Sequence, residues 1–138
     1  MSKVAIVFWS QTGNTETMAN CIAEGAGANA TIIPCSEMNA AKLGEYDVVA
    51  FGCPAMGAEQ LEESEFEPMF SDLEGSLNGK KVAMFGSYGW GDGEWMRSWE
   101  KDCDDSGLRL VCESVTCCET PDDAALDACR ALGKELAK

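Results

Sequence analysis

Short apolar runs alternate with amphipathic stretches along the whole chain, and this alternation limits the fold more than any other feature of the sequence. It is typical of β–α–β units, in which helices join parallel strands and cover both faces of their sheet. The first, third and fourth runs are almost continuously apolar, which suits central strands that are buried on both faces. We therefore predict five strands, at residues 3–9, 31–34, 47–52, 81–86 and 109–117.

Apolar residues between the predicted strands recur at helical spacing, so we predict that each such stripe forms the core-facing side of a helix. The last helix opens with Pro121 and an acidic first turn, and both favour a helix start. Residues 37–43 are predicted to form only a short or irregular helix. The four stripes consist of Met18, Ala19, Ile22, Ala23 and Ala26; of Phe66, Met69, Phe70, Leu73 and Leu77; of Trp95, Met96, Trp99 and Cys103; and of Ala125, Cys129, Leu132 and Leu136.

The number and spacing of the predicted elements indicate an α/β fold, a three-layer αβα sandwich. A length of 138 residues is that of one ordinary domain, so we predict a single domain over residues 1–138. Right-handed crossovers leave few arrangements of five parallel strands, and the doubly wound order 2-1-3-4-5 is one of the two common ones. In such folds a ligand binds beyond the carboxyl ends of strands 1 and 3, so we expect the loops after strands 1, 3 and 4 to carry the function.

The charge of the chain excludes several kinds of partner and chemistry. Acidic residues outnumber basic residues by 24 to 10 and histidine is absent, which gives a net charge of −14. This charge repels nucleic-acid backbones and anionic membrane surfaces, whereas it favours basic protein partners. The lack of histidine excludes Ser-His-Asp and Cys-His catalysis and imidazole metal sites.

The cysteine pattern gives no sign of a metal site. Eight cysteines are present, but no two have the Cys-x-x-Cys spacing of zinc ribbons. Cys112 and Cys117 begin the spacing of a plant-type ferredoxin, but the next cysteine of that pattern would fall on Thr120. The apolar run at residues 4–9 is too short for a signal peptide or a membrane span, so we expect a cytoplasmic protein with reduced thiols.

The loop after the first predicted strand, residues 10–15, is uncharged and rich in hydroxyl groups. A phosphate placed there would accept hydrogen bonds from backbone N–H groups at a helix start and from side-chain hydroxyls, at the favourable end of the helix dipole. A simpler alternative is that Asn14 or Thr15 caps the helix and Gly13 forms the turn. The loop lacks the Gly-Lys-Ser/Thr ending of a Walker loop, which disfavours nucleotide triphosphates. Its residues are Ser10, Gln11, Thr12, Gly13, Asn14 and Thr15.

The loop after the third predicted strand, residues 53–59, offers groups that suit a flat aromatic ligand. Met56 has a polarizable thioether, Gly57 can adopt positive φ, and Glu59 can accept a hydrogen bond from a ring N–H. Each has a plainer alternative, since methionine commonly fills cores, glycine marks turns and glutamate faces solvent. The candidate binding residues here are Pro54, Ala55, Met56, Gly57, Ala58 and Glu59.

The loop after the fourth predicted strand, residues 87–93, places a tryptophan among three glycines. Trp90 must either pack into a distant pocket or lie against a planar ligand that the glycines allow to approach. The three loops leave one edge of the sheet at adjacent strands, so phosphate donors, an aromatic ring and a thioether would line one slot. Such a slot fits flavin mononucleotide (FMN). The candidate residues of this loop are Ser87, Tyr88, Gly89, Trp90 and Gly91.

Residues 8–16, 51–70 and 78–97 closely resemble the short-chain flavodoxins of clostridia and related anaerobes, and the remainder agrees with them in pattern and length. The resemblance implies a flavodoxin-like fold with FMN as the cofactor. It implies an electron-transfer protein rather than an enzyme, a low-potential one-electron carrier that shuttles between neutral semiquinone and anionic hydroquinone. The implied partners are redox enzymes with basic docking patches, namely reductases and oxidoreductases that also use ferredoxin, and a monomer is the simplest assembly.

The same resemblance implies roles for single residues. Met56 would cover the inner face of the flavin and Trp90 the outer face. The peptide at Gly57 would turn over on reduction and act as the redox switch, while Glu59 would meet the ring N3–H. Residues 10–15 match the phosphate loop of the family, and residues 87–91 would surround the ribityl chain and the pyrimidine edge of the ring.

The chain also departs from close members of that family. Gln11 stands where a glycine is frequent, Ala58 replaces a more usual polar residue, and Pro54 removes a backbone donor near the phosphate. Glu119 falls where a neutral amide commonly faces the ribityl chain. We expect these departures to tune the site rather than to abolish FMN binding.

Two other functions are compatible with a fold of this topology. A flavin-dependent reductase, such as a quinone reductase, would use the same phosphate loop, but it needs space over the ring that Trp90 would close. A receiver domain requires acidic residues after strands 1 and 3 and a lysine at the end of strand 5. The sequence has none of these residues at those positions, so an electron carrier remains the favoured interpretation.

Overall fold

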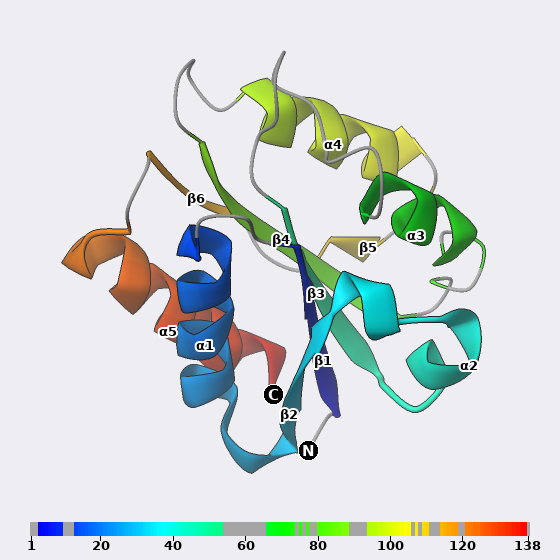
Figure 1. The fold of residues 1–138 in the computed structure, drawn as a ribbon, viewed down its shortest axis with the longest axis horizontal. Helices are drawn as coiled ribbons and strands as arrows, with labels where there is room; N and C mark the ends of the chain where they lie inside the picture. The colour runs from blue at the N-terminus through cyan, green and yellow to red at the C-terminus, as the bar shows by residue number, and fades with distance from the viewer. Residues whose placement is uncertain are drawn as a thin grey trace.

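The computed structural model describes residues 3–9, 13–53, 66–73, 75, 77, 80–88, 94–105, 107, 109–110, 114–118 and 121–137. These residues form a parallel β-sheet that carries helices on both of its faces (Figure 1). The predicted α/β class is therefore confirmed.

Every strand pair in the sheet is parallel. The strand order is β2-β1-β3-β4-β5, and β6 pairs with β4 next to β5, which confirms the predicted order 2-1-3-4-5. The predicted fifth strand thus consists of two short segments that follow one another along β4. The strands are β1 (Val4–Phe8), β2 (Ala30–Pro34), β3 (Val48–Gly52), β4 (Lys81–Tyr88), β5 (Arg109–Leu110) and β6 (Val115–Cys118).

Helices cover the sheet in two groups. Helices α1 and α5 lie together on one face, and α2, α3 and α4 lie on the other (Figure 1). In the segment at residues 37–43, for which the sequence predicts a short or irregular helix, Glu37 ends a 3₁₀ turn, residues 38 and 39 are extended, and a four-residue helix follows. The helices are α1 (Asn14–Ala26), α2 (Ala40–Leu43), α3 (Phe66–Leu73), α4 (Glu94–Asp105) and α5 (Asp123–Leu136), with 3₁₀ turns η1 (Gly27–Asn29) and η2 (Cys35–Glu37).

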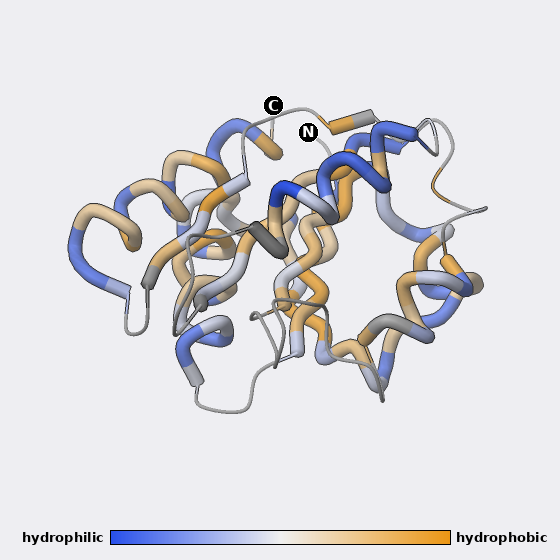
Figure 2. Tube along the Cα trace, turned by 90° about the horizontal axis from the view of Figure 1, so that it is seen from above, coloured by the Kyte–Doolittle hydropathy of each residue, from blue (hydrophilic) through white to orange (hydrophobic). Residues whose placement is uncertain are grey.

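The hydrophobic core consists of two layers, one on each face of the sheet. Alternate residues of β1 and β3 enter opposite layers, and all residues of both strands are buried, as their continuous apolar runs predict. Apolar segments accordingly gather in the central strands (Figure 2). Among the predicted helix stripes, Ala23 is half-buried and the side chain of Trp95 lies outside the described residues, whereas all other members are buried. Leu77 is buried but lies beyond the end of α3 at Leu73, so its predicted place in a helical stripe is wrong.

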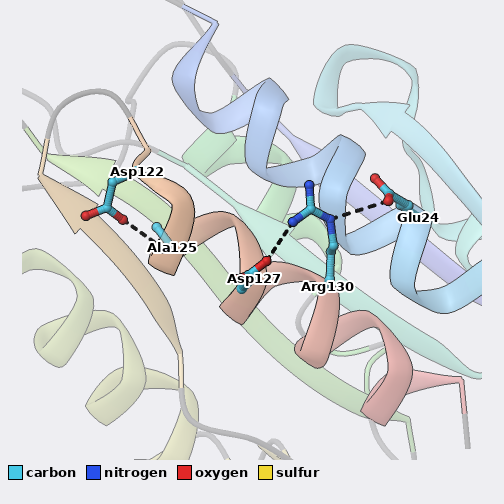
Figure 3. Close-up of polar contacts among 5 residues, drawn as sticks. All are labelled: Glu24, Asp122, Ala125, Asp127 and Arg130. Carbon is cyan, nitrogen blue, oxygen red and sulfur yellow. Dashed lines mark hydrogen bonds and ion pairs between the residues drawn. The ribbon is translucent and has the colours of Figure 1, made fainter.

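The start of α5 differs from its prediction in one detail. Asp122 is the N-cap, and its Oδ1 accepts a hydrogen bond of 2.8 Å from the backbone N–H of Ala125 (Figure 3). A carboxylate in this position satisfies a first-turn donor that the helix cannot satisfy itself. Pro121 consequently lies one residue before the cap, not in the first turn of the helix.

Two glycines allow α1 and α5 to pack at close range. A Cβ on Gly25 would overlap the carbonyl oxygen of Arg130, and a Cβ on Gly133 would overlap that of Ile22. The guanidinium of Arg130 also links the two helices, since its Nε lies 3.4 Å from Glu24 of α1, while its Nη1 lies 2.8 Å from Asp127 of the same helix, α5 (Figure 3). These ion pairs are exposed to solvent and contribute little, so the close backbone contact determines how the helices pack.

Within the described ranges, every helix is too short or too polar to traverse a bilayer.

Candidate functional site

The carboxyl ends of β1, β3 and β4 meet at one edge of the sheet, as predicted. Phe8 pairs with Gly52, and Gly52 pairs with Phe85, after which β4 continues for three more residues beside β6. Two backbone hydrogen bonds extend this pairing into the loops. The N–H of Trp9 donates to Gly52 at 3.0 Å, and that of Cys53 donates to Phe85 at 3.2 Å. The first and second candidate loops therefore begin from fixed neighbouring positions.

The first turn of α1 is the next described element after β1. Gly13 is the N-cap with φ of +93°, and no hydrogen bond from a side chain among the described residues caps the helix. The hydroxyl of Thr17 instead donates to the carbonyl oxygen of Gly13 at 2.9 Å. Neither Asn14 nor Thr15 is the cap, so that alternative is not supported. The first-turn N–H groups and the positive end of the helix dipole would face an anion bound at this helix start.

The hydroxyl of Thr15 is the most informative polar group of this turn. Its side chain is 1% exposed, and Oγ1 has no hydrogen-bond partner in the part of the chain that the structure describes. A buried hydroxyl without a partner costs about 1–3 kcal/mol. An anion bound at the helix start would satisfy this group, because its oxygens can accept from both Oγ1 and the first-turn N–H groups.

Ser87 is the second buried polar residue at this edge. It is 4% exposed, and it pairs with Cys117 of the neighbouring strand. Side chains alternate along a strand, so Ser87 faces the same layer as Phe85, which packs with Met18 of α1. Thr15 and Ser87 are the only buried polar residues in the described ranges. Both were predicted site residues, and both lie on the α1 side of the sheet.

The remaining predicted residues fall largely outside the described part of the chain. Asn14 is half-buried at the start of α1, and Tyr88 is described only as the last backbone position of β4. The roles of Met56, Gly57 and Trp90 are therefore not tested by the structure. The predicted residues outside the described ranges are Ser10, Gln11, Thr12, Pro54, Ala55, Met56, Gly57, Ala58, Glu59, Gly89, Trp90 and Gly91.

Sequence reasoning missed one pair of residues that shapes this edge. A Cβ on Gly52 would overlap the ring of Phe85, so only glycine allows β3 to end against that ring. The available signal was a glycine closing an otherwise apolar strand, which can mark the close approach of another group. Nothing in the sequence pointed to Phe85 as that group.

A hollow lies outside this edge of the sheet, and a cluster of potential metal ligands is absent from the described residues. A hollow of about 530 Å³ lies between η2, α2 and α3, lined in part by Met38, Met69 and Leu73, and it contains no predicted site residue. A group of three or more potential metal ligands is not found among the described residues. The described site is thus made of backbone donors and hydroxyl groups.

A doubly wound parallel sheet whose first helix starts at the carboxyl end of its strands defines an α/β protein of the class that binds ligands at that edge. The flavodoxin family model matches residues 6–133. The chain is 46% identical to the flavodoxin of Megasphaera elsdenii over 98% of both chains. It is also 46% identical to that of Clostridium beijerinckii, over 96% of this chain and 97% of the relative. The chain therefore belongs to the flavodoxin family.

Solved structures agree with this assignment. The solution structure of two-electron reduced Megasphaera elsdenii flavodoxin has a TM-score of 0.88 and 45% identity, covering 97% of this chain and 98% of that one. The crystal structure of oxidised Flavodoxin 2 from Bacillus cereus has a TM-score of 0.84 and 29% identity, covering 98% and 97%. The chain is accordingly an FMN-bound electron carrier, an electron-transfer protein rather than an enzyme.

Proposed function

We propose that this protein is a low-potential one-electron carrier whose FMN lies at the carboxyl edge of the sheet, with its phosphate on the first turn of α1. The observation that carries this placement is the buried hydroxyl of Thr15, which has no hydrogen-bond partner among the described residues and lies at a helix start that none of their side chains caps. Bound FMN would supply the one-electron redox chemistry. The protein binds and orients the cofactor and determines which of its forms is stable.

The phosphate needs no cation from the first loop. Residues 10–15 are uncharged, so the phosphate would be held by first-turn N–H groups, the hydroxyl of Thr15 and the helix dipole. The positive φ of Gly13 supports this arrangement, because a residue with a Cβ would cost about 1–2 kcal/mol there. Ser10, Gln11, Thr12 and Asn14 complete the proposed phosphate loop.

The ring would be held by the second and third loops. We assign Met56 to one face of the ring and Trp90 to the other, since a thioether and an indole both pack favourably on aromatic surfaces. Gly57 can turn its peptide at low cost, and Glu59 can accept from the ring N–H. The other proposed residues of these loops are Pro54, Ala55, Ala58, Ser87, Tyr88, Gly89 and Gly91. The burial of Ser87 at the end of β4 supports its inclusion.

The net charge of −14 supports a low potential for the second electron. Two-electron reduction leaves an anionic ring, and each carboxylate about 10 Å away raises its energy by about 0.4 kcal/mol in a water-like dielectric. Several such carboxylates would lower the potential for the second electron by tens of millivolts. A tenfold change in a one-electron equilibrium constant corresponds to about 59 mV. Burial of the ring beneath Trp90 and Met56 would act in the same direction.

Membership of the family implies redox partner proteins. We propose that these are reductases and oxidoreductases that also use ferredoxin, and that they dock through basic patches on the acidic surface of this chain. A monomer with one domain over residues 1–138 is the simplest form of such a carrier. We place it in the cytoplasm, where its eight cysteines would remain reduced thiols.

A spectroscopic titration tests the proposal. The purified protein is expected to be yellow and to release FMN rather than the adenine dinucleotide when it unfolds. Stepwise reduction with dithionite should produce a stable one-electron-reduced form with long-wavelength absorbance. Gly57→Thr should reduce the maximum amount of that form, because a Cβ disfavours the turned peptide. An unchanged amount in this variant would refute the role of Gly57, and a folded protein without affinity for FMN would refute the function.

A further inference from the structure

A thiol–thioether contact joins β6 to α1 across the layer that contains Thr15 and Ser87. The Sγ of Cys117 donates to the Sδ of Met18 at a distance of 3.7 Å. A thiol is a weak donor and a thioether a weak acceptor, so the contact is directional as well as apolar. Met18 is completely buried and Cys117 is half-buried.

The contact lies one helical turn after Thr15, the residue at which the proposed phosphate site is placed. Met18 follows Thr15 by three residues, so the two side chains lie on the same face of the helix. That face packs on the sheet, since both residues are buried. A shift of Met18 along the sheet would therefore move the hydroxyl of Thr15 with it.

Cys117 also lies beside the third loop of the proposed site. It pairs with Ser87 in the parallel register of β4 and β6, so their side chains point to the same face. Ser87 begins the segment that we assign to the ribityl chain and the ring edge, whereas Thr15 belongs to the phosphate site. Cys117 thus lies between the end of β4, which we assign to the ribityl chain, and the start of α1, which we assign to the phosphate.

We propose that Cys117 is a positioning residue for the cofactor. Through its contact with Met18, Cys117 holds the first turn of α1 in register with the end of β4, and so it sets the affinity for the phosphate of FMN. This inference rests on the proposed function, because it requires the phosphate at Thr15. The proposed effect concerns only the phosphate of FMN. Riboflavin has the same ring and ribityl chain without the phosphate, so it is the control ligand.

The chain contains its own control for this contact. Cys103 Sγ donates to Met84 Sδ at 3.8 Å, between α4 and β4 on the opposite face of the sheet. Met84 is as completely buried as Met18. Met18→Leu and Met84→Leu both remove a thioether acceptor while keeping the volume of the side chain, so their general effects on packing are comparable.

The experiment measures the dissociation constants of FMN and riboflavin by quenching of flavin fluorescence, together with urea unfolding of the FMN-free protein. Met18→Leu is expected to lower the preference for FMN over riboflavin by about threefold to tenfold, with riboflavin affinity unchanged. Met84→Leu should keep the preference of the unmodified protein. The proposal would be overturned if the preference for FMN changed equally in the two variants, or if Met18→Leu lost affinity for FMN and riboflavin to the same extent.

Variants of Cys117 provide an independent measurement. Cys117→Ala should lower the same preference, and Cys117→Ser should restore most of it, because a hydroxyl can still donate to the thioether. Equal preferences in these two variants would count against the contact. An unmodified protein that binds FMN no better than riboflavin would instead refute the phosphate site itself, so failure of the inference and failure of the function are distinguishable.

Discussion

The ring of Phe85 fills the space beside Gly52, so that no other residue fits at the carboxyl end of β3 without displacing it. The two residues are register partners in neighbouring strands. Cys53, the next residue along the chain, donates its N–H to the carbonyl oxygen of Phe85 at 3.2 Å. This packing holds the point at which the second loop of the proposed site leaves the sheet.

Gly52→Ala should therefore destabilise the protein. We expect a loss of about 1–3 kcal/mol in the free energy of unfolding, because the added methyl group overpacks a core that has no free volume at this point. FMN affinity should fall as well, since the start of the second loop is displaced. Urea unfolding of the FMN-free protein and a fluorescence titration measure the two effects.

A second substitution checks the cause. Phe85→Leu makes room beside position 52, so the double variant Gly52→Ala/Phe85→Leu should lose less stability than the sum of the two single losses, by about 1 kcal/mol. If the two losses simply add, the ring of Phe85 is not what excludes a side chain at position 52.

Thr15→Val should change stability and FMN affinity in opposite directions. Loss of a hydrogen bond to a charged phosphate should weaken FMN binding by about 1.5–3 kcal/mol. The FMN-free protein should gain about 1 kcal/mol in its free energy of unfolding, because valine removes a buried hydroxyl that no described residue satisfies. Thr15→Ser keeps the hydroxyl and should bind FMN nearly as the unmodified protein does. Parallel losses of affinity and stability in Thr15→Val would show that the residue is only structural.

Gly133→Ala should destabilise the protein although alanine is the better helix former. Helix propensity alone would favour alanine by about 0.5–1 kcal/mol. A Cβ there would overlap the carbonyl oxygen of Ile22 in α1, so we expect a net loss of about 1–3 kcal/mol in urea unfolding. Gly75→Ala is the packing control, because a Cβ at that position would meet no heavy atom of another described residue within 4 Å. A variant at position 133 as stable as the control would contradict the close packing of α1 and α5.

Cys129 makes stability depend on pH in the alkaline range. Burial, followed by the neighbouring thiols of Cys21 and Cys117, raises the pKa of Cys129 from 9.0 to about 12. Between these two values the folded protein keeps a proton that the unfolded chain loses, so this contribution is complete below pH 9 and is lost as the pH rises toward 12. In Cys129→Ala, stability should decline less steeply over this window, by up to about 1.4 kcal/mol per pH unit.

The comparison is made by urea unfolding of both proteins at several pH values from 8 upward, because other groups that titrate in this range contribute equally to both. Identical slopes would mean that Cys129 ionises as readily in the folded protein as in the unfolded chain.

Much of the fold follows from the sequence because periodicity is a local property. The continuous apolar runs at β1 and β3 and the helical stripes at Met18–Ile22 and Leu132–Leu136 reflect which faces must leave water, and chain handedness then allows few strand orders. The same pattern predicts three loops that leave the sheet at one edge, whereas the resemblance to flavodoxins rests on the particular residues at 8–16, 51–70 and 78–97. Even the buried hydroxyl of Thr15 stands in a stretch that the sequence marked as a phosphate loop.

Other features were decided only by tertiary structure. The sequence left open whether Asn14 or Thr15 caps α1, and it gave no reason to pair Gly52 with Phe85, Gly133 with Ile22, or Cys117 with Met18. The last pair is separated by 99 positions along the chain. Such contacts depend on how two surfaces fit once the layers have packed, and local patterns record which side chains are buried without recording which atoms they meet.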